Sequence, residues 1–110
     1  MGYIEKSDYE SAAADLNTGI KRDPQLPLCY FARSDLHFSG AEYQKAVDDL
    51  TKALYLRPGS AAMLMKRGKA YEHLGEEDKA LADFKAAAAI VPSSKKIQDA
   101  IERLSKDSKS

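Results

Sequence analysis

Three side chains in this sequence have the chemistry for catalysis or metal binding, namely Cys29, His37 and His73. A cysteine and a histidine act as nucleophile and general base only within hydrogen-bond reach of each other. Cys29 and His37 lie in one predicted helix, separated by about 12 Å along its axis at a rise of about 1.5 Å per residue. No Cys/His set has the spacing of a zinc site. The sequence therefore predicts no enzymatic activity, no metal and no cofactor.

The other polar signals have structural interpretations. His37 is expected to pack between helices, His73 to lie at the surface, and Cys29 to serve as a small, half-buried hydrophobic residue. The acidic run Glu76-Glu77-Asp78 stands at a predicted helix start, where negative charge complements the helix dipole. The glycines do not form a phosphate-binding loop, and Gly68 and Gly75 are interpreted as helix breaks.

Composition excludes several classes of protein. The 110 residues carry 17 basic and 17 acidic side chains, so there is no overall positive field to bind nucleic acid or an anionic membrane. No apolar run approaches the roughly 20 residues that cross a bilayer. A single cysteine excludes an intrachain disulfide, and the start of the chain lacks the apolar region of a secretory signal. We expect a soluble, cytoplasmic protein.

The elements that must position these residues follow an internal repeat. Pro24, Pro58 and Pro92 recur at equal intervals, and further columns keep the same step. These columns are Ala12, Ala46 and Ala80; Asp15, Asp49 and Asp83; Leu16, Leu50 and Phe84; Gly19, Ala53 and Ala87; Tyr3, His37 and Tyr71; and Tyr9 and Tyr43, with Glu77 as the exception. A fixed period of roughly 20–50 residues is typical of repeat architectures, and this interval falls within that range.

Each unit has the apolar spacing of amphipathic helices, and the proline that follows ends the second helix of the unit. Helices are predicted at residues 3–6, 8–22, 27–39, 42–56, 61–74, 76–90 and 94–106. One helix pair cannot bury its apolar stripe alone, so successive pairs are expected to stack on one another.

A 34-residue helix–turn–helix repeat with these columns resembles the tetratricopeptide repeat (TPR). The third unit carries the signature through Leu64, Arg67-Gly68, Tyr71, Gly75, Ala80, Phe84, Ala87 and Pro92. The second unit departs from it at Arg33-Ser34, His37 and Ala41. The resemblance implies an all-α fold, in which the repeats stack into a right-handed α-solenoid with a C-terminal capping helix.

The resulting division of the chain is one domain over residues 1–110. It comprises a partial repeat at 1–26 (mostly its second helix), repeats at 27–60 and 61–94, a capping helix at 95–106 and a tail at 107–110. The capping helix directs Ile97, Ala100, Ile101 and Leu104 inward, and leaves Lys95 and Lys96 free to face water.

The resemblance implies that the first helix of each pair lines a concave face that binds a peptide or helix of another protein. The candidate groove residues are Phe31, Asp35, Phe38, Met65, Lys66, Lys69 and His73. An aromatic stripe at helical spacing also suits a packed core, so both interpretations of Phe31 and Phe38 stand. The expected function is a non-enzymatic adaptor or scaffold.

Two alternatives remain open. The chain suits a structural segment of a longer solenoid, or a module that self-associates through its uncovered N-terminal helix into a homo-oligomer. A co-chaperone role without an intact carboxylate clamp is the other alternative. Three of the clamp positions of chaperone-binding TPR domains fall on Ala32, Ala62 and Lys66, and only Lys66 is basic.

Two structural ion pairs are also predicted. Arg33 precedes Asp49, and Arg67 precedes Asp83, by one and the same interval within the repeat. Each arginine therefore lies in the first predicted helix of its unit, and each aspartate lies in the second helix, which packs against the first. Pairing with the aspartate would allow an arginine to occupy a position that is usually leucine.

Overall fold

The structure is a computed structural model that describes residues 6–109. Within this range the chain forms α-helices and no strand, which confirms the predicted all-α class. The helices are α1 (Lys6–Arg22), α2 (Pro27–Ser39), α3 (Tyr43–Leu56), α4 (Ala61–His73), α5 (Glu77–Ile90) and α6 (Lys95–Lys109). The short helix predicted at 3–6 lies, but for its last residue, outside the described part of the chain.

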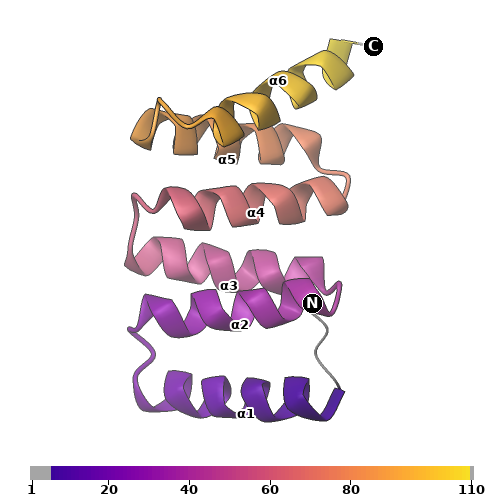
Figure 1. Cartoon of the computed structure of the whole chain (residues 1–110). Coiled ribbons are helices and arrows are strands. Elements are labelled where there is room, and N and C mark those ends of the chain that lie inside the picture. The colour runs from indigo at the N-terminus through magenta and orange to yellow at the C-terminus, as the bar shows by residue number, and fades with distance from the viewer. Residues whose placement is uncertain (1–5, 110) are drawn as a thin grey trace.

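The helices stack in chain order into an elongated body of 43 × 27 × 23 Å, with α1 at one end and α6 at the other (Figure 1). The substantial contacts between helices join elements that follow each other along the chain. This nearest-neighbour packing is the architecture of an α-solenoid, as predicted.

The helix boundaries follow from local sequence. Pro27 occupies the first turn of α2, where its missing N–H costs nothing. The Ser60 hydroxyl caps α4 by accepting a hydrogen bond from the Met63 N–H at 3.3 Å, and Ser94 caps α6 in the same way. The helices α3 and α5 each end shortly before a proline, Pro58 and Pro92 respectively.

The repeat columns form the core in the second and third units. Ala46, Leu50 and Ala53 of α3, and Ala80, Phe84 and Ala87 of α5, are all 0% exposed. The matching residues of α1, Ala12, Leu16 and Gly19, remain partly exposed. Among the described residues, the first unit therefore has its second helix, whose core-facing side remains partly exposed.

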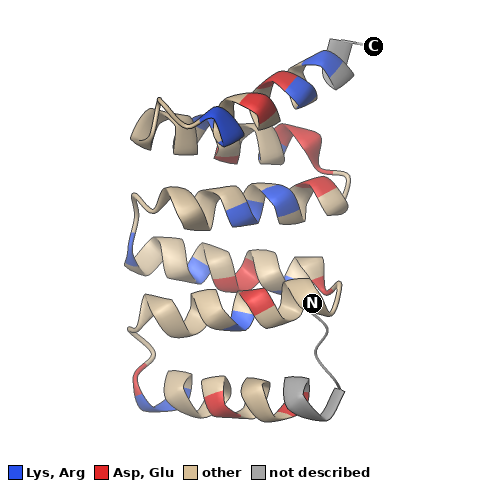
Figure 2. Cartoon of the chain, viewed as in Figure 1, with Lys and Arg blue, Asp and Glu red and all other residues tan. Residues whose placement is uncertain are grey.

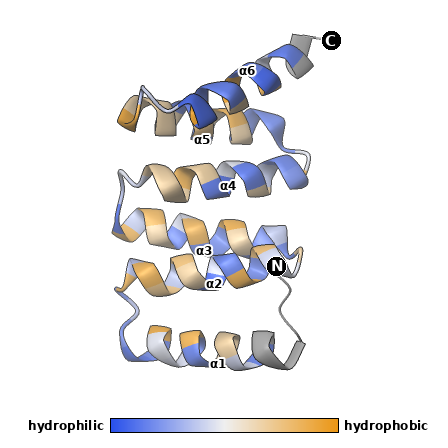
Figure 3. Ribbon diagram, viewed as in Figure 1, coloured by the Kyte–Doolittle hydropathy of each residue, from blue (hydrophilic) through white to orange (hydrophobic). Residues whose placement is uncertain are grey.

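At the other end, α6 packs against α5 as the predicted cap. Ile97, Ala100 and Leu104 are buried, and the rest of the helix is mostly hydrophilic (Figure 3). The helix continues to Lys109, so most of the expected C-terminal tail is helical. No glycine or proline follows Lys106 to end the helix earlier.

The interpretation of Gly68 as a helix break is wrong. Gly68 lies inside α4 and is buried against α5, where a Cβ atom would come within 2.6 Å of the Phe84 ring. The residue is glycine because the two helices approach closely at a bulky aromatic side chain. Gly75, by contrast, has a φ of 78° in the turn between α4 and α5, a conformation that suits glycine.

Candidate functional site

Each of the two repeat arginines makes a bidentate pair with the predicted aspartate. Arg33 donates from Nε and Nη2 to Asp49 at 2.7 and 2.6 Å, and Arg67 donates to Asp83 at 2.8 and 2.7 Å. Both carboxylates are almost fully buried. The hydrogen bonds to aspartate raise the pKa of both guanidinium groups, so these arginines stay charged.

Each of these arginines also reaches the preceding repeat. Arg33 Nη1 donates to Asn17 on α1 at 2.8 Å, and Arg67 Nη1 donates to Thr51 on α3 at 3.2 Å. One guanidinium therefore joins the second helices of two successive units. All of these contacts lie within the stack, so the pairs hold the scaffold together.

The residues with catalytic chemistry are engaged in packing between helices. His37 lies with Nδ1 3.3 Å from Glu42 and Nε2 3.3 Å from Asp49, between α2 and α3. Cys29 is half-buried, and its sulfur packs near Gly19 of α1. Within the described residues, no group of three or more His, Cys, Asp or Glu side chains could hold a metal ion. None of the helices described is long and apolar enough to cross a membrane.

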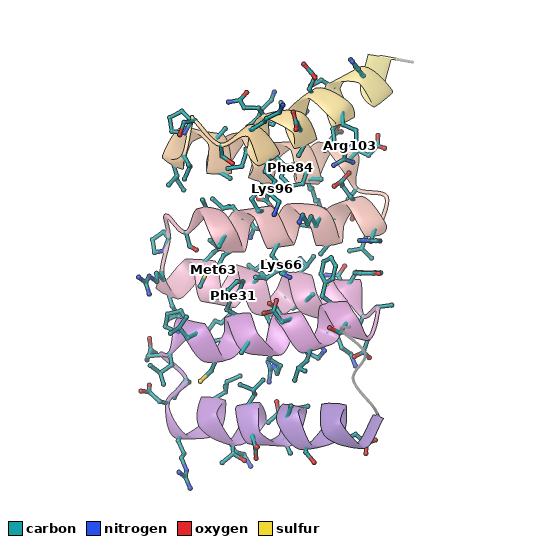
Figure 4. The ribbon with its side chains drawn as sticks, in the orientation of Figure 1. Phe31, Met63, Lys66, Phe84, Lys96 and Arg103 are labelled. Carbon is teal, nitrogen blue, oxygen red and sulfur yellow. The ribbon has the colours of Figure 1, made fainter. Side chains whose placement is uncertain are left out.

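A cavity of about 370 Å³ opens on the side of the solenoid formed by α2, α4 and α6. Its apolar lining consists of Phe31, Ala61, Ala62, Met65, Val91 and Ile97, and its polar lining of Lys66, Lys69, Ser94 and Lys96. In Figure 4, Phe31, Lys66 and Lys96 follow one another from α2 through α4 to α6. Of the predicted groove residues, the structure brings Phe31, Met65, Lys66 and Lys69 together here.

The rim of this cavity is basic. Figure 2 shows blue segments in the middle of α4 and near the start of α6. Lys66 pairs with Asp35 at 3.0 Å, and Arg103 pairs with Glu72. Burial and the nearby charges of Lys96 and Lys66 lower the pKa of Lys69 below its ordinary value. In the part of the chain that the structure describes, neither Lys69 nor Lys96 has an ion-pair partner.

Phe38 and His73, also predicted for the groove, lie outside the cavity lining. The His73 ring stacks on Tyr43 with centroids 4.2 Å apart, and the Phe38 ring meets both of these rings edge-on. Lys66 lies above the Phe38 ring at 4.9 Å. These aromatic side chains hold α2, α3 and α4 together beside the cavity.

Sequence reasoning missed the contribution of α6 and of the segment before it. Val91, Ser94, Lys96 and Ile97 form one wall of the cavity, whereas this region was expected only to cap the stack. The repeat period of the sequence already indicated that α6 contributes to the cavity. Lys96 stands one repeat period after Ala62, and both residues line the cavity.

The chain matches the family described as tetratricopeptide repeat. Its pattern matches residues 2–61 and again residues 31–95. Tetratricopeptide repeat protein 28 of Mus musculus is 33% identical over 87 residues, which are 79% of this chain and 4% of that protein. The chain thus spans a small part of this relative.

Solved structures of similar shape support the same fold. The first TPR of Spaghetti (RPAP3), bound to the HSP90 peptide SRMEEVD, superposes with a TM-score of 0.88 at 20% identity, over 96% of this chain and 83% of that one. The TPR domain of Arabidopsis OM64 has a TM-score of 0.83 at 27% identity, over 91% of this chain and 83% of that one.

Proposed function

The chain belongs to the tetratricopeptide repeat family, and we propose that it binds a segment of another protein in the cavity between α2, α4 and α6. Its general character as a protein-interaction module follows from the family. Members of this family are typically interaction modules rather than enzymes, and one neighbour of the same fold holds an HSP90 peptide.

The observation that carries the proposal is the cavity itself. It is open to solvent and large enough for one or two side chains, and it has an apolar lining and a charged rim. Met65 and Lys66 are only half-buried, and Ala62 and Lys96 are exposed, so a ligand could reach them without any unfolding. A preformed pocket of this kind lowers the ordering cost of binding.

A chaperone carboxylate clamp is not supported by these residues. Two of the corresponding positions are alanines, Ala32 and Ala62, and the third, Lys66, already pairs with Asp35. A terminal carboxylate needs several converging donors to replace its hydration. We therefore propose a ligand that is held mainly by the apolar cavity.

The test is a substitution that blocks the cavity and leaves the core residues unchanged. Ala62 is exposed and lines the cavity, so Ala62→Gln fills part of it with a flexible side chain. For a partner recovered by pull-down with the intact chain, we expect affinity to fall about 10- to 100-fold, as for the loss of one buried apolar side chain.

The matched control is Ala86→Gln, the same change at an exposed position of α5 that does not line the cavity. This variant should bind as the parent does, and circular dichroism should show equal helix content in all three proteins. Equal affinity of the two variants would contradict the proposal and direct the search to another face.

Self-association through α1 is a second candidate. Ala12 and Leu16 are partly exposed, although their counterparts in α3 and α5 are fully buried. The same uncovered face also suits a neighbouring repeat of a longer solenoid. Sedimentation of the chain over a range of concentrations tests self-association, and a monomer throughout that range would contradict it.

A further inference from the structure

We propose that the partner segment is acidic, with an aspartate or glutamate side chain that pairs with Lys69 and Lys96 while an adjacent bulky apolar side chain enters the cavity. This inference rests on the proposed function and names the chemistry of the partner. It also makes α6 part of the binding site in addition to its role as a cap.

The first argument is the charge that is left uncompensated. Lys66, Lys69 and Lys96 line the cavity from α4 and α6, and the charge of Arg103 on α6 also acts on Lys69. Asp35 and Glu72 pair with Lys66 and Arg103 respectively. Lys69 and Lys96 remain without an ion-pair partner among the described residues. The positive charges of Lys96, Lys66 and Arg103 repel that of Lys69, and the Glu72 carboxylate offsets only part of this repulsion. A carboxylate placed between Lys69 and Lys96 would relieve this repulsion.

The second argument is the apolar surface next to those charges. Phe31, Met65 and Ile97 line the cavity from α2, α4 and α6, and Val91 closes it while remaining 38% exposed. Because the lysines and the apolar lining belong to one cavity, an acidic residue and an apolar residue adjacent in a peptide can engage both. A purely acidic segment would leave the apolar lining exposed to water.

The carboxylate is assigned to a side chain rather than to a chain end. A terminal carboxylate needs several converging donors to replace its hydration, whereas these two lysines supply only two point charges on flexible stems. Lys69 and Lys96 are both exposed, so they can follow a side chain that varies in position.

The experiment titrates the full chain with peptides and follows the Met65 methyl group by NMR. The probe is an acetylated and amidated peptide, Gly-Ser-Glu-Leu-Glu-Ser-Gly. Its comparison peptides replace both glutamates by glutamine, or replace leucine by alanine. A fourth peptide, Gly-Ser-Gln-Leu, is acetylated, carries glutamine in place of glutamate and ends at leucine with a free C-terminal carboxylate.

We expect the glutamate peptide to shift the Met65 signal and to bind about three- to tenfold more tightly than the glutamine peptide, as for one or two exposed ion pairs. The double variant Lys69→Gln, Lys96→Gln should bind the glutamate peptide about three- to tenfold more weakly than the parent does. The control Lys52→Gln, Lys85→Gln removes two exposed charges from α3 and α5, away from the cavity, and should leave the affinity unchanged.

Equal binding of the glutamate and glutamine peptides would overturn the inference, and so would equal losses in the two double variants or binding only of the peptide with a free C-terminus. Absence of any Met65 shift at millimolar peptide would do so as well. If the glutamine peptide shifts Met65 as strongly as the glutamate peptide, the acidic preference fails while the cavity remains a binding site. The Ala62→Gln comparison separately decides the proposed function.

Discussion

At the scale of single residues, the most consequential contacts are those of Arg33 and Arg67. Each guanidinium meets a buried aspartate through two short hydrogen bonds and also reaches a polar side chain of the preceding unit. Removing one partner of such a pair leaves the other charge without compensation. We expect Asp83→Ala to lower the free energy of unfolding by about 3 kcal/mol, measured by urea denaturation.

The chain contains its own control for this prediction. Asp15 stands in the same repeat column as Asp83, but it is exposed, and no ion pair joins it to another of the described residues. Asp15→Ala should therefore change the free energy of unfolding by less than about 0.5 kcal/mol. Equal losses in the two variants would show that the pair with Arg67 is not the cause.

At the scale of elements, the spacing of α4 and α5 depends on Gly68 and Phe84. A Cβ atom at position 68 would lie 2.6 Å from the Phe84 ring, which is 0% exposed. We expect Gly68→Ser to lower the free energy of unfolding by about 1–3 kcal/mol through overpacking. Thermal unfolding of the parent and the variant, followed by circular dichroism, would measure this loss of stability.

The second repeat shows how this loss can be reversed. There the two equivalent positions hold Ser34 and Leu50, both fully buried. Phe84→Leu alone should be destabilising because it leaves a cavity. The double variant Gly68→Ser, Phe84→Leu should lose less free energy of unfolding than the two single variants lose in sum. Additive losses would contradict the close approach of α4 and α5 at this point.

At the scale of the whole molecule, a solenoid with nearest-neighbour contacts has unequal stability along its length. At one end, α1 packs substantially only on α2 and keeps Ala12 and Leu16 partly exposed. At the other, α6 buries Ile97, Ala100 and Leu104 against its neighbours. We expect amide hydrogen exchange to be fastest in α1 and slower in α6, with the strongest protection in α4 and α5.

The comparison of the two terminal helices is the control, since among the described residues α1 packs substantially on α2 alone and α6 on α5 alone. Equal protection of α1 and α6 in dilute solution would contradict the proposed difference. If α1 becomes protected only as the protein concentration rises, its uncovered face is the surface of self-association.

The sequence by itself determined the repeat, the helices and the pairing of Arg33 and Arg67 with Asp49 and Asp83. Apolar spacing and proline positions act locally, and a constant repeat period places the same columns between the same helices in each unit. Because one column holds arginine and the facing column holds aspartate, the sequence alone predicts an ion pair between the two helices of each unit.

Only the tertiary structure decided which groove residues meet. It separates Phe38 and His73, which pack against Tyr43, from Phe31 and Met65, which line the cavity. It also brings Lys96 of α6 to the same cavity and shows Gly68 as a point of close approach. These features depend on the distance and side-chain packing between helices from different units. Periodicity within one helix carries no information about that packing.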